Sequence, residues 1–230
     1  RMPGSIREIF VPRIRDQVVL RAIGDLIKGK LAGGSPSSCN TSPRQAVKQV
    51  IAARADGFRF VLRTDIEKYY RSIPHDALLE RVQGLQIDEI AFQLVADILT
   101  TPFRNPAEGR AGDVVPRRGV PTGTSISTIL GELYLTDLLK DAETQDRLKV
   151  VRYSDDLLLA SANKMDLKDD AVRLESAIQK KGLTLSKAKT KWTSFDEGLE
   201  FLGFEFEGNQ IYVSRKKSAR WIRTYQGIAR

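Results

Sequence analysis

The stretch VVRYSDDLLL, residues 150–159, decides how the rest of the chain is interpreted. Two adjacent carboxylates, Asp155 and Asp156, stand between apolar runs that are typical of β-strands. Aspartate is a good turn former, but two-residue hairpin turns favour Gly or Asn, and neither is present. The segment 149–161 therefore predicts two short strands around a tight acidic turn.

The apolar residues on both sides indicate a buried hairpin, where two like charges repel each other unless a cation neutralises them. Carboxylate oxygens are hard ligands that suit Mg²⁺. A third aspartate, Asp65, lies near the end of the β-forming run 58–66; taken alone, it is better explained as a helix cap or a surface residue. If Asp65 and Asp155 lie on neighbouring strands, they complete a set able to hold two ions, which lie about 3.5–4 Å apart in phosphoryl-transfer sites.

Helices are predicted on both sides of these strands. Their expected ranges are 14–30, a helix from Ser42-Pro43, 75–84, 86–100, Ser125 to about Asp141, and 166–181 ending at Gly182. A polar loop is expected over 104–118, and short strands over 191–213 with a turn at Gly208-Asn209. Helices interleaved with antiparallel strands indicate the α+β class rather than a doubly wound sheet.

The composition is that of one large globular domain or two intimate subdomains, with 230 residues, 41% hydrophobic and 29% charged. A formal net charge of +8 is common among nucleic-acid-binding proteins, although many basic proteins bind none. The single cysteine, Cys39, excludes an intramolecular disulfide and a Cys-based zinc site. No apolar run approaches about 18 residues and no signal peptide is evident, so we expect no membrane association and a cytoplasmic location.

With these segments in place, the chain resembles the reverse transcriptase family. Residues 65–70 are similar to the family's motif A, residues 153–156 to its Tyr-x-Asp-Asp box, and residues 118–125 to motif B. Further similarities are to motif D (182–186 with 189–191), to the primer-grip hairpin (200–204), and to the fingers segment of bacterial enzymes related to group II introns (7–12 with 15–16). The boxes occur in the family's order over residues 7–213, and this order makes the resemblance specific.

The resemblance implies the fingers and palm of a right-hand polymerase, with an antiparallel palm sheet packed on helices and most of the thumb absent. The implied division is fingers over 1–57, palm over 58–213 with embedded helical segments at about 75–118, and a thumb start or basic tail over 214–230.

The resemblance also implies roles for individual residues. Asp65 and Asp155 would be the principal ligands of two Mg²⁺ ions, with Mn²⁺ as a substitute, Asp156 a ligand or a neighbour of the ligands, and the carbonyl of Ile66 a further ligand. Tyr70 would lie under the sugar and exclude a 2′-hydroxyl. The remaining implied contacts are Arg7, Thr122, Gly123 and Lys189 to the nucleotide, Leu202 and Gly203 to the primer end, and Arg215, Lys216, Lys217 and Arg220 to nucleic acid. Ordinary structural roles are the alternative: Tyr70 as a core aromatic, and Arg7 and Lys189 as surface charges.

The implied function is RNA-directed DNA synthesis from dNTPs on an RNA template, with a DNA or RNA primer, in a bacterial lineage that includes antiviral defence enzymes. A dedicated non-coding RNA or further domains are expected partners. Motif B departs from the family pattern, because Thr122 occupies the position of the usual glutamine. This departure keeps open untemplated or protein-primed synthesis, and a catalytically silent RNA-binding scaffold remains a third hypothesis.

Overall fold

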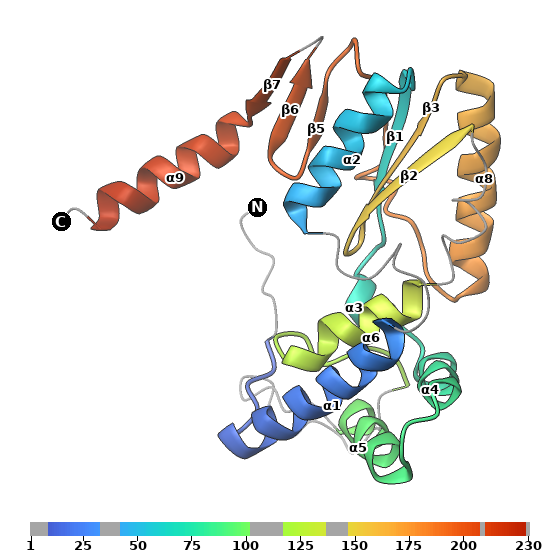
Figure 1. Ribbon diagram of the computed structural model, residues 1–230, viewed down its shortest axis with the longest axis vertical. Helices are drawn as coiled ribbons and strands as arrows, with labels where there is room; N and C mark the ends of the chain where they lie inside the picture. Colours follow the sequence, from blue (N-terminus) through green and yellow to red (C-terminus); the bar gives the residue numbers. More distant parts are fainter. Residues whose placement is uncertain (1–8, 33–41, 102–116, 137–146, 208–209, 229–230) are drawn as a thin grey trace. The chain divides into compact units, whose positions relative to one another are not determined.

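The computed structural model describes residues 9–32, 42–101, 117–136, 147–207 and 210–228. The chain divides into two compact units, each formed by segments that are distant in sequence (Figure 1). The first, here called the helical unit, comprises 1–39, 66–138 and 177–184; the second, the sheet unit, comprises 40–65, 139–176 and 185–230.

The helical unit is built around one apolar helix, α6 (Ser125–Leu135). Both α1 (Ile14–Ala32) and α4 (His75–Gly84) pack on α6, and α5 (Glu89–Thr100) packs on α4. The short helix α3 (Tyr69–Ser72) precedes α4. The contact between α1 and α6 is close, because a Cβ at Gly24 would lie 2.8 Å from Cδ1 of Ile129.

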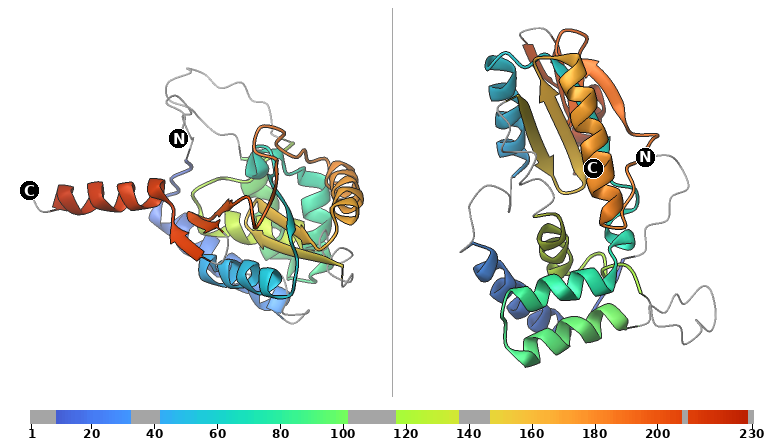
Figure 2. Two further views of the ribbon diagram at one scale, coloured as in Figure 1. Left: turned by 90° about the horizontal axis from the view of Figure 1, so that it is seen from above. Right: turned by 90° about the vertical axis from the view of Figure 1, so that its right-hand side faces the viewer.

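The sheet unit contains a four-stranded antiparallel sheet in the order β2-β3-β1-β4. Its strands are β1 (Phe60–Asp65), β2 (Leu148–Tyr153), β3 (Asp156–Ser161) and β4 (Lys191–Ser194). Figure 2 shows α2 (Pro43–Ala55) and α8 (Lys164–Lys180) on opposite faces of this sheet. A second, three-stranded sheet is formed by β5 (Leu199–Phe201), β6 (Phe204–Glu207) and β7 (Gln210–Val213), and α9 (Arg215–Ile228) follows it.

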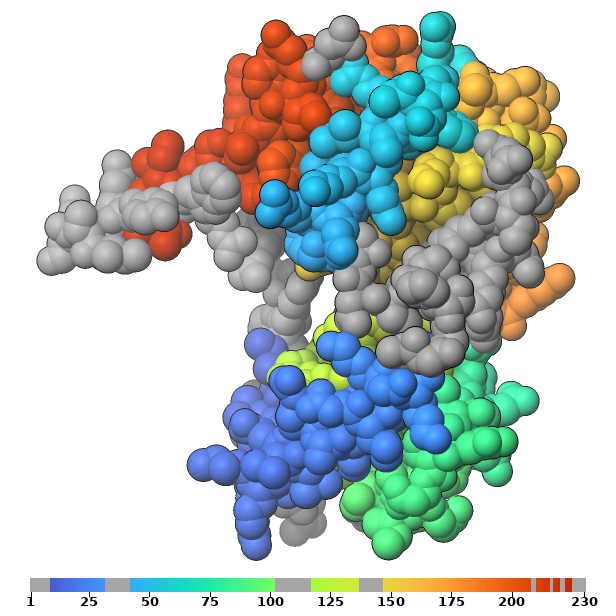
Figure 3. Space-filling model, in the orientation of Figure 1, coloured from blue at the N-terminus to red at the C-terminus, as the bar shows by residue number. Residues whose placement is uncertain are grey.

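The core of the sheet unit lies between α2 and the two sheets. Successive strand residues point to opposite faces, so Val61 and Leu158 face α2 whereas Leu62 and Leu159 face the other side. The buried residues on the α2 side form one cluster: Ala46, Val47, Val50, Ala53, Val61, Val151, Leu158, Ala160, Phe195, Leu199, Phe201 and Phe206. In Figure 3 the light-blue surface of α2 lies beside the yellow surface of β2, with which it packs.

Local sequence signals explain where several helices begin and end. Ser42 and Gln45 form a capping box, in which each side chain bonds the other residue's backbone N–H, and Pro43 occupies the first turn. Asp88 caps α5, so this helix begins at Glu89 rather than at the predicted residue 86. Gly182 follows α8 in the left-handed conformation (φ +70°), as the sequence predicts.

The predicted α+β class with an antiparallel sheet is confirmed. The helix α2, which the sequence analysis grouped with residues 1–57, packs on β2 in the sheet unit. Most of the predicted 104–118 loop, the helix extension towards Asp141, the Gly208-Asn209 turn and Arg7 lie outside the described residues. Within the described residues, no helix has the length and apolar character needed to cross a membrane.

Candidate active site

Strand register brings the acidic residues to one end of the four-stranded sheet. Asp65, the last residue of β1, pairs directly with Asp156, the first residue of β3. Asp156 also pairs with Tyr153 at the end of β2, so Asp155 lies in the two-residue turn that joins β2 to β3. The backbone of Asp65 is held by Ser186, whose N–H donates to the Asp65 carbonyl (2.7 Å).

The turn before Asp155 is made without the glycine or asparagine that two-residue hairpin turns usually favour. Ser154 adopts the left-handed conformation itself, with φ of +58°. A non-glycine residue in this region is strained, and the hydrogen-bonded pairing of β2 and β3 on both sides holds it there. Such strain is common where a turn must present functional side chains.

The carboxylate of Asp65 is buried, and its environment disfavours the charged form. Burial raises the pKa of Asp65, and the nearby carboxylates of Asp155 and Asp156 raise it further, whereas a hydrogen bond from Lys189 lowers it. Lys189 donates to Oδ2 of Asp65, and Oδ1 is buried without a hydrogen-bond partner in the described part of the chain. A buried carboxylate oxygen without a partner is costly, so this site is suited to a further cation.

Asp156 is held by a residue that the sequence analysis did not single out. Nη2 of Arg63 donates to Oδ1 of Asp156 (3.2 Å), and both side chains are part-buried. Arg63 lies two residues before Asp65 on β1, so the period-2 rule places the two on one face of the sheet. That spacing was the signal in the sequence that could have identified it.

The side-chain chemistry of the acidic residues suits a divalent cation. Asp65, Asp155 and Asp156 supply hard oxygen ligands, including the unpartnered Oδ1 of Asp65. Burial, and after it the repulsion from Asp155 and Asp156, raises the pKa of Asp65, and a bound cation would offset both effects. Among the described residues, however, no group of three or more Asp, Glu, His or Cys side chains is already arranged to hold a metal ion. Lys189 is paired with Asp65, and Arg63 is paired with Asp156.

Tyr70 lies in the helical unit, packed against α6. A Cβ at Gly131 would lie 2.9 Å from Cε1 of Tyr70 and 3.2 Å from Cε1 of Tyr69, whose hydroxyl donates to the Gly131 carbonyl (2.5 Å). The carbonyl of Tyr70 accepts from the N–H of Val120 (2.7 Å). The segment that carries Tyr70 is therefore hydrogen-bonded to the segment that carries Val120. The missing side chain at Gly131 lets the rings of Tyr69 and Tyr70 lie close to α6.

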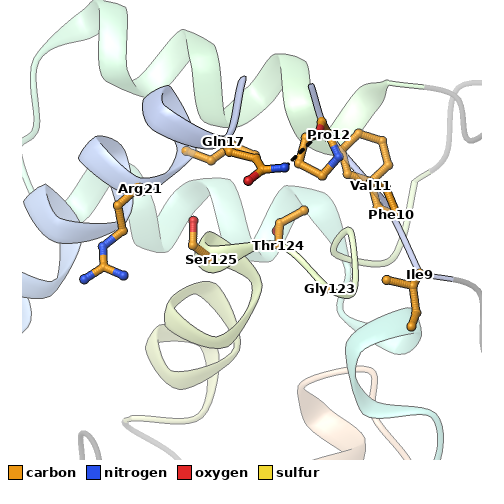
Figure 4. A pocket seen from close by; sticks show the side chains of 10 residues that line it. Ile9, Phe10, Val11, Pro12, Gln17, Arg21, Gly123, Thr124 and Ser125 are labelled. Carbon is orange, nitrogen blue, oxygen red and sulfur yellow. Dashed lines mark hydrogen bonds between the residues drawn. The ribbon is translucent and has the colours of Figure 1, made fainter. Parts of the chain in front are cut away.

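Gly123 lies beside a cavity of about 360 Å³ at the start of α6 (Figure 4). Thr124 and Ser125 line it, together with residues 9–12 and with Gln17 and Arg21 of α1. Gly123 has φ of +96°, which favours glycine, and the N–H of Phe10 donates to the carbonyl of Thr122 (2.8 Å). The structure thus brings the predicted residues Thr122 and Gly123 against the chain's N-terminal segment.

Leu202 and Gly203 form the two-residue turn between β5 and β6, with φ of +49° and +78°. Positive φ at both positions is typical of a type I′ hairpin turn. A Cβ at Gly203 would lie 2.7 Å from Cδ of Lys217, and the N–H of Ser214 donates to the Gly203 carbonyl (2.9 Å). Lys217 also places its ammonium group 4.1 Å from the ring centroid of Phe204, so the start of α9 is anchored to this turn.

The other predicted site residues are described only in part. The side chain of Ile66 is buried in the helical unit, directly after Asp65 in the chain. Arg215 is exposed at the start of α9, whereas the side chains of Lys216 and Arg220 lie outside the described part.

Comparison with known proteins gives consistent results. Residues 2–206 match the family described as "Reverse transcriptase (RNA-dependent DNA polymerase)". The chain is 24% identical over 142 residues to the Pol polyprotein of the type-1 retrotransposable element R2 of Popillia japonica, covering 56% of this chain and 20% of that protein.

Among solved structures, similar folds occur in two telomerases. Telomerase of Candida tropicalis in complex with a telomeric RNA fragment matches with a TM-score of 0.66 and 15% identity, covering 85% of this chain and 37% of that chain. The corresponding complex from Candida albicans matches with a TM-score of 0.59 and 14% identity, over 90% and 41%. The chain thus shares their fold and spans less than half the length of each of these proteins.

Proposed function

The chain belongs to the reverse transcriptase (RNA-dependent DNA polymerase) family, and from this membership we propose that it extends a primer 3′ end with deoxynucleotides while copying RNA. The observation that carries the proposal is the pairing of Asp65 with Asp156, beside Asp155, at one end of the sheet. The buried and unpartnered oxygen of Asp65 supports a cation there.

Asp65 and Asp155 would hold the divalent metal ions that reverse transcriptase domains generally use, and we propose Mg²⁺ with Mn²⁺ as a substitute. When bound, these ions lower the pKa of the primer 3′-hydroxyl and offset the charge that develops on the transferred phosphoryl group. Asp65 must release Lys189 for this purpose. The Lys189 side chain is 65% exposed, so replacing its ion pair with Asp65 by a metal ion costs little free energy. The ammonium group of Lys189 is then free to donate a proton to the leaving pyrophosphate.

Tyr70 is proposed to select deoxynucleotides. Its ring is held against α6 by the absence of a side chain at Gly131 and by the neighbouring ring of Tyr69, whose centroid is 5.1 Å away. A fixed aromatic ring of this kind rejects an added hydroxyl by steric exclusion rather than by hydrogen bonding.

We propose further that the protein is bacterial and acts in antiviral defence. Its proposed partners are an RNA template, a DNA or RNA primer and a dedicated non-coding RNA. Arg215 and the other basic residues of α9 would contact the nucleic-acid backbone through charge. Thr122 favours one alternative, untemplated or protein-primed synthesis, because threonine lacks the amide group by which the family's usual glutamine positions nucleotide or template. Sequencing of the products separates these possibilities, since untemplated DNA does not match the supplied RNA.

A primer-extension assay on the longest native protein containing this chain tests the proposal. We expect Mg²⁺-dependent addition of dNTPs on an RNA template, and its loss in the Asp155→Ala/Asp156→Ala variant. Asp169→Ala/Glu175→Ala is the matched control, because it removes the same charge from exposed positions of α8. A preference for ribonucleotides would contradict the role of Tyr70, and equal activity in both double variants would contradict the site.

A further inference from the structure

We propose that Arg63 is a positioning residue that fixes Asp156 and connects the acidic turn to the hairpin that carries Leu202 and Gly203. The inference rests on the proposed function and adds a residue that the sequence motifs do not include. It concerns the sheet unit alone, because Arg63, Asp156 and the hairpin all belong to that unit.

The strand register explains why Arg63 turns towards Asp156. On β1, Arg63 stands opposite Leu158 of β3 and Lys191 of β4. Lys191 carries the same charge and repels it, whereas Asp156 is its diagonal neighbour on β3, within reach of a long side chain. The pairing of β1 with both neighbours therefore directs the guanidinium group towards the acidic end of the sheet.

The guanidinium group of Arg63 has two hydrogen-bonded partners that lie on different sheets. Nη2 donates to Oδ1 of Asp156 (3.2 Å), and Nη1 donates to the carbonyl of Glu200 in β5 (2.6 Å). The group also lies 5.7 Å from the ring centroid of Phe201, which is buried. Arginine carries its N–H donors on separate nitrogens of one rigid plane, whereas the lysine ammonium is a single nitrogen, so we expect lysine not to make both bonds.

The two cations at the acidic end of the sheet differ in how firmly they are held. Lys189 reaches Asp65 with a side chain that is 65% exposed, whereas the side chain of Arg63 is 28% exposed and is fixed by β5 as well as by Asp156. A cation that enters the site would displace the exposed lysine and leave the arginine. One oxygen of Asp156 thus remains bound to Arg63, and Asp156 orients the turn while Asp65 and Asp155 supply the principal ligands.

The contact at Glu200 extends this arrangement to the hairpin. Glu200 and Phe201 end at the turn of Leu202 and Gly203, where the Gly203 carbonyl accepts from Ser214 before α9 begins. Arg63 therefore sets the distance between the carboxylates and the turn proposed to hold the primer end. Because small misplacements of reacting groups slow catalysis strongly, a shift at this contact would lower the rate without removing any ligand.

The test uses the longest native protein containing this chain and the variant Arg63→Lys, which keeps the charge. Arg173→Lys is the matched control, because Arg173 binds Asp170 (3.1 Å) in the same unit and Arg147 also binds that aspartate (2.9 Å). We expect Arg63→Lys to lower kcat for primer extension about 10–100-fold with KM for dNTP changed less than about twofold, and the control to match wild type. Hydrogen exchange over 199–213 should be faster in Arg63→Lys only.

A double-mutant cycle distinguishes positioning from general structural support. If Arg63 acts through Asp156, the Arg63→Lys/Asp156→Ala double variant should be no slower than the slower single variant, within about twofold, because alanine leaves no acceptor for the arginine. Multiplicative effects, or unchanged exchange over 199–213, would overturn the inference. If the wild-type protein incorporates no nucleotide, the proposed function fails, and the exchange measurement still decides whether Arg63 holds the hairpin.

Discussion

Gly131 allows Tyr69 and Tyr70 to pack against α6, and a methyl group at this position tests that arrangement. The added Cβ would lie 2.9 Å from Cε1 of Tyr70 and 3.2 Å from Cε1 of Tyr69. Real Cβ atoms do not approach carbon this closely, because repulsion between the atoms is too strong. Gly131→Ala therefore forces the Tyr70 ring to move.

The expected change in stability combines two opposing effects. Alanine is better than glycine in a helix interior by about 0.8–1.0 kcal/mol. Overpacking a filled site costs about 1–3 kcal/mol. We expect the free energy of unfolding to fall by about 0–2 kcal/mol, and the melting midpoint to fall by about 2–4 °C for each kcal/mol lost.

Gly29→Ala is the matched control, because it makes the same change in α1, where nothing lies within 4 Å of the added Cβ. This control should raise stability by about 0.5–1 kcal/mol. The assay is calorimetric melting of both variants together with primer extension using deoxy- and ribonucleotides. Displacement of Tyr70 should lower the deoxy-to-ribo ratio of kcat/KM by about tenfold or more, whereas the control keeps it. The reasoning is refuted if Gly131→Ala is as stable as Gly29→Ala and keeps the wild-type ratio.

Three further predictions concern the acidic end of the sheet. Asp65→Asn should abolish incorporation yet stabilise the metal-free protein at neutral pH. Because folding raises the pKa of Asp65, the stabilisation that this carboxyl gives the wild-type protein is complete below about pH 3.8 and is lost as the pH rises through the folded pKa. Melting from pH 3 to pH 8 without metal checks the sign. Lys189→Gln should change the free energy of unfolding by less than about 1 kcal/mol because the lysine is mostly exposed, but should lower kcat for primer extension about 10²-fold or more; an unchanged kcat would contradict its role. Asp156→Asn should retain more activity than Asp155→Asn, because the amide oxygen can still accept from the arginine that binds Asp156; equal losses in single-turnover assays would contradict this assignment.

Short-range signals in the sequence predicted much of the fold. The N-cap residue Ser42 followed by Pro43 predicted the start of α2, and the apolar runs around Asp155 predicted β2 and β3. These features depend on residues within one helical turn or one strand, so they can be read from the chain directly. The ordered motifs identified the family for the same reason, since each motif is a local segment.

Other features required the tertiary structure, because they depend on which strands become neighbours and in which register. Nothing within 58–66 states that Asp65 will pair with Asp156, or that Arg63 will reach both Asp156 and Glu200. The left-handed Ser154 was likewise unexpected, because local preference favours Gly or Asn and only the pairing on both sides overrides it. The sequence by itself therefore determined the elements and the carboxylates. Packing of the sheet determined the partners of those carboxylates, since cross-strand contacts join residues that are far apart in the chain.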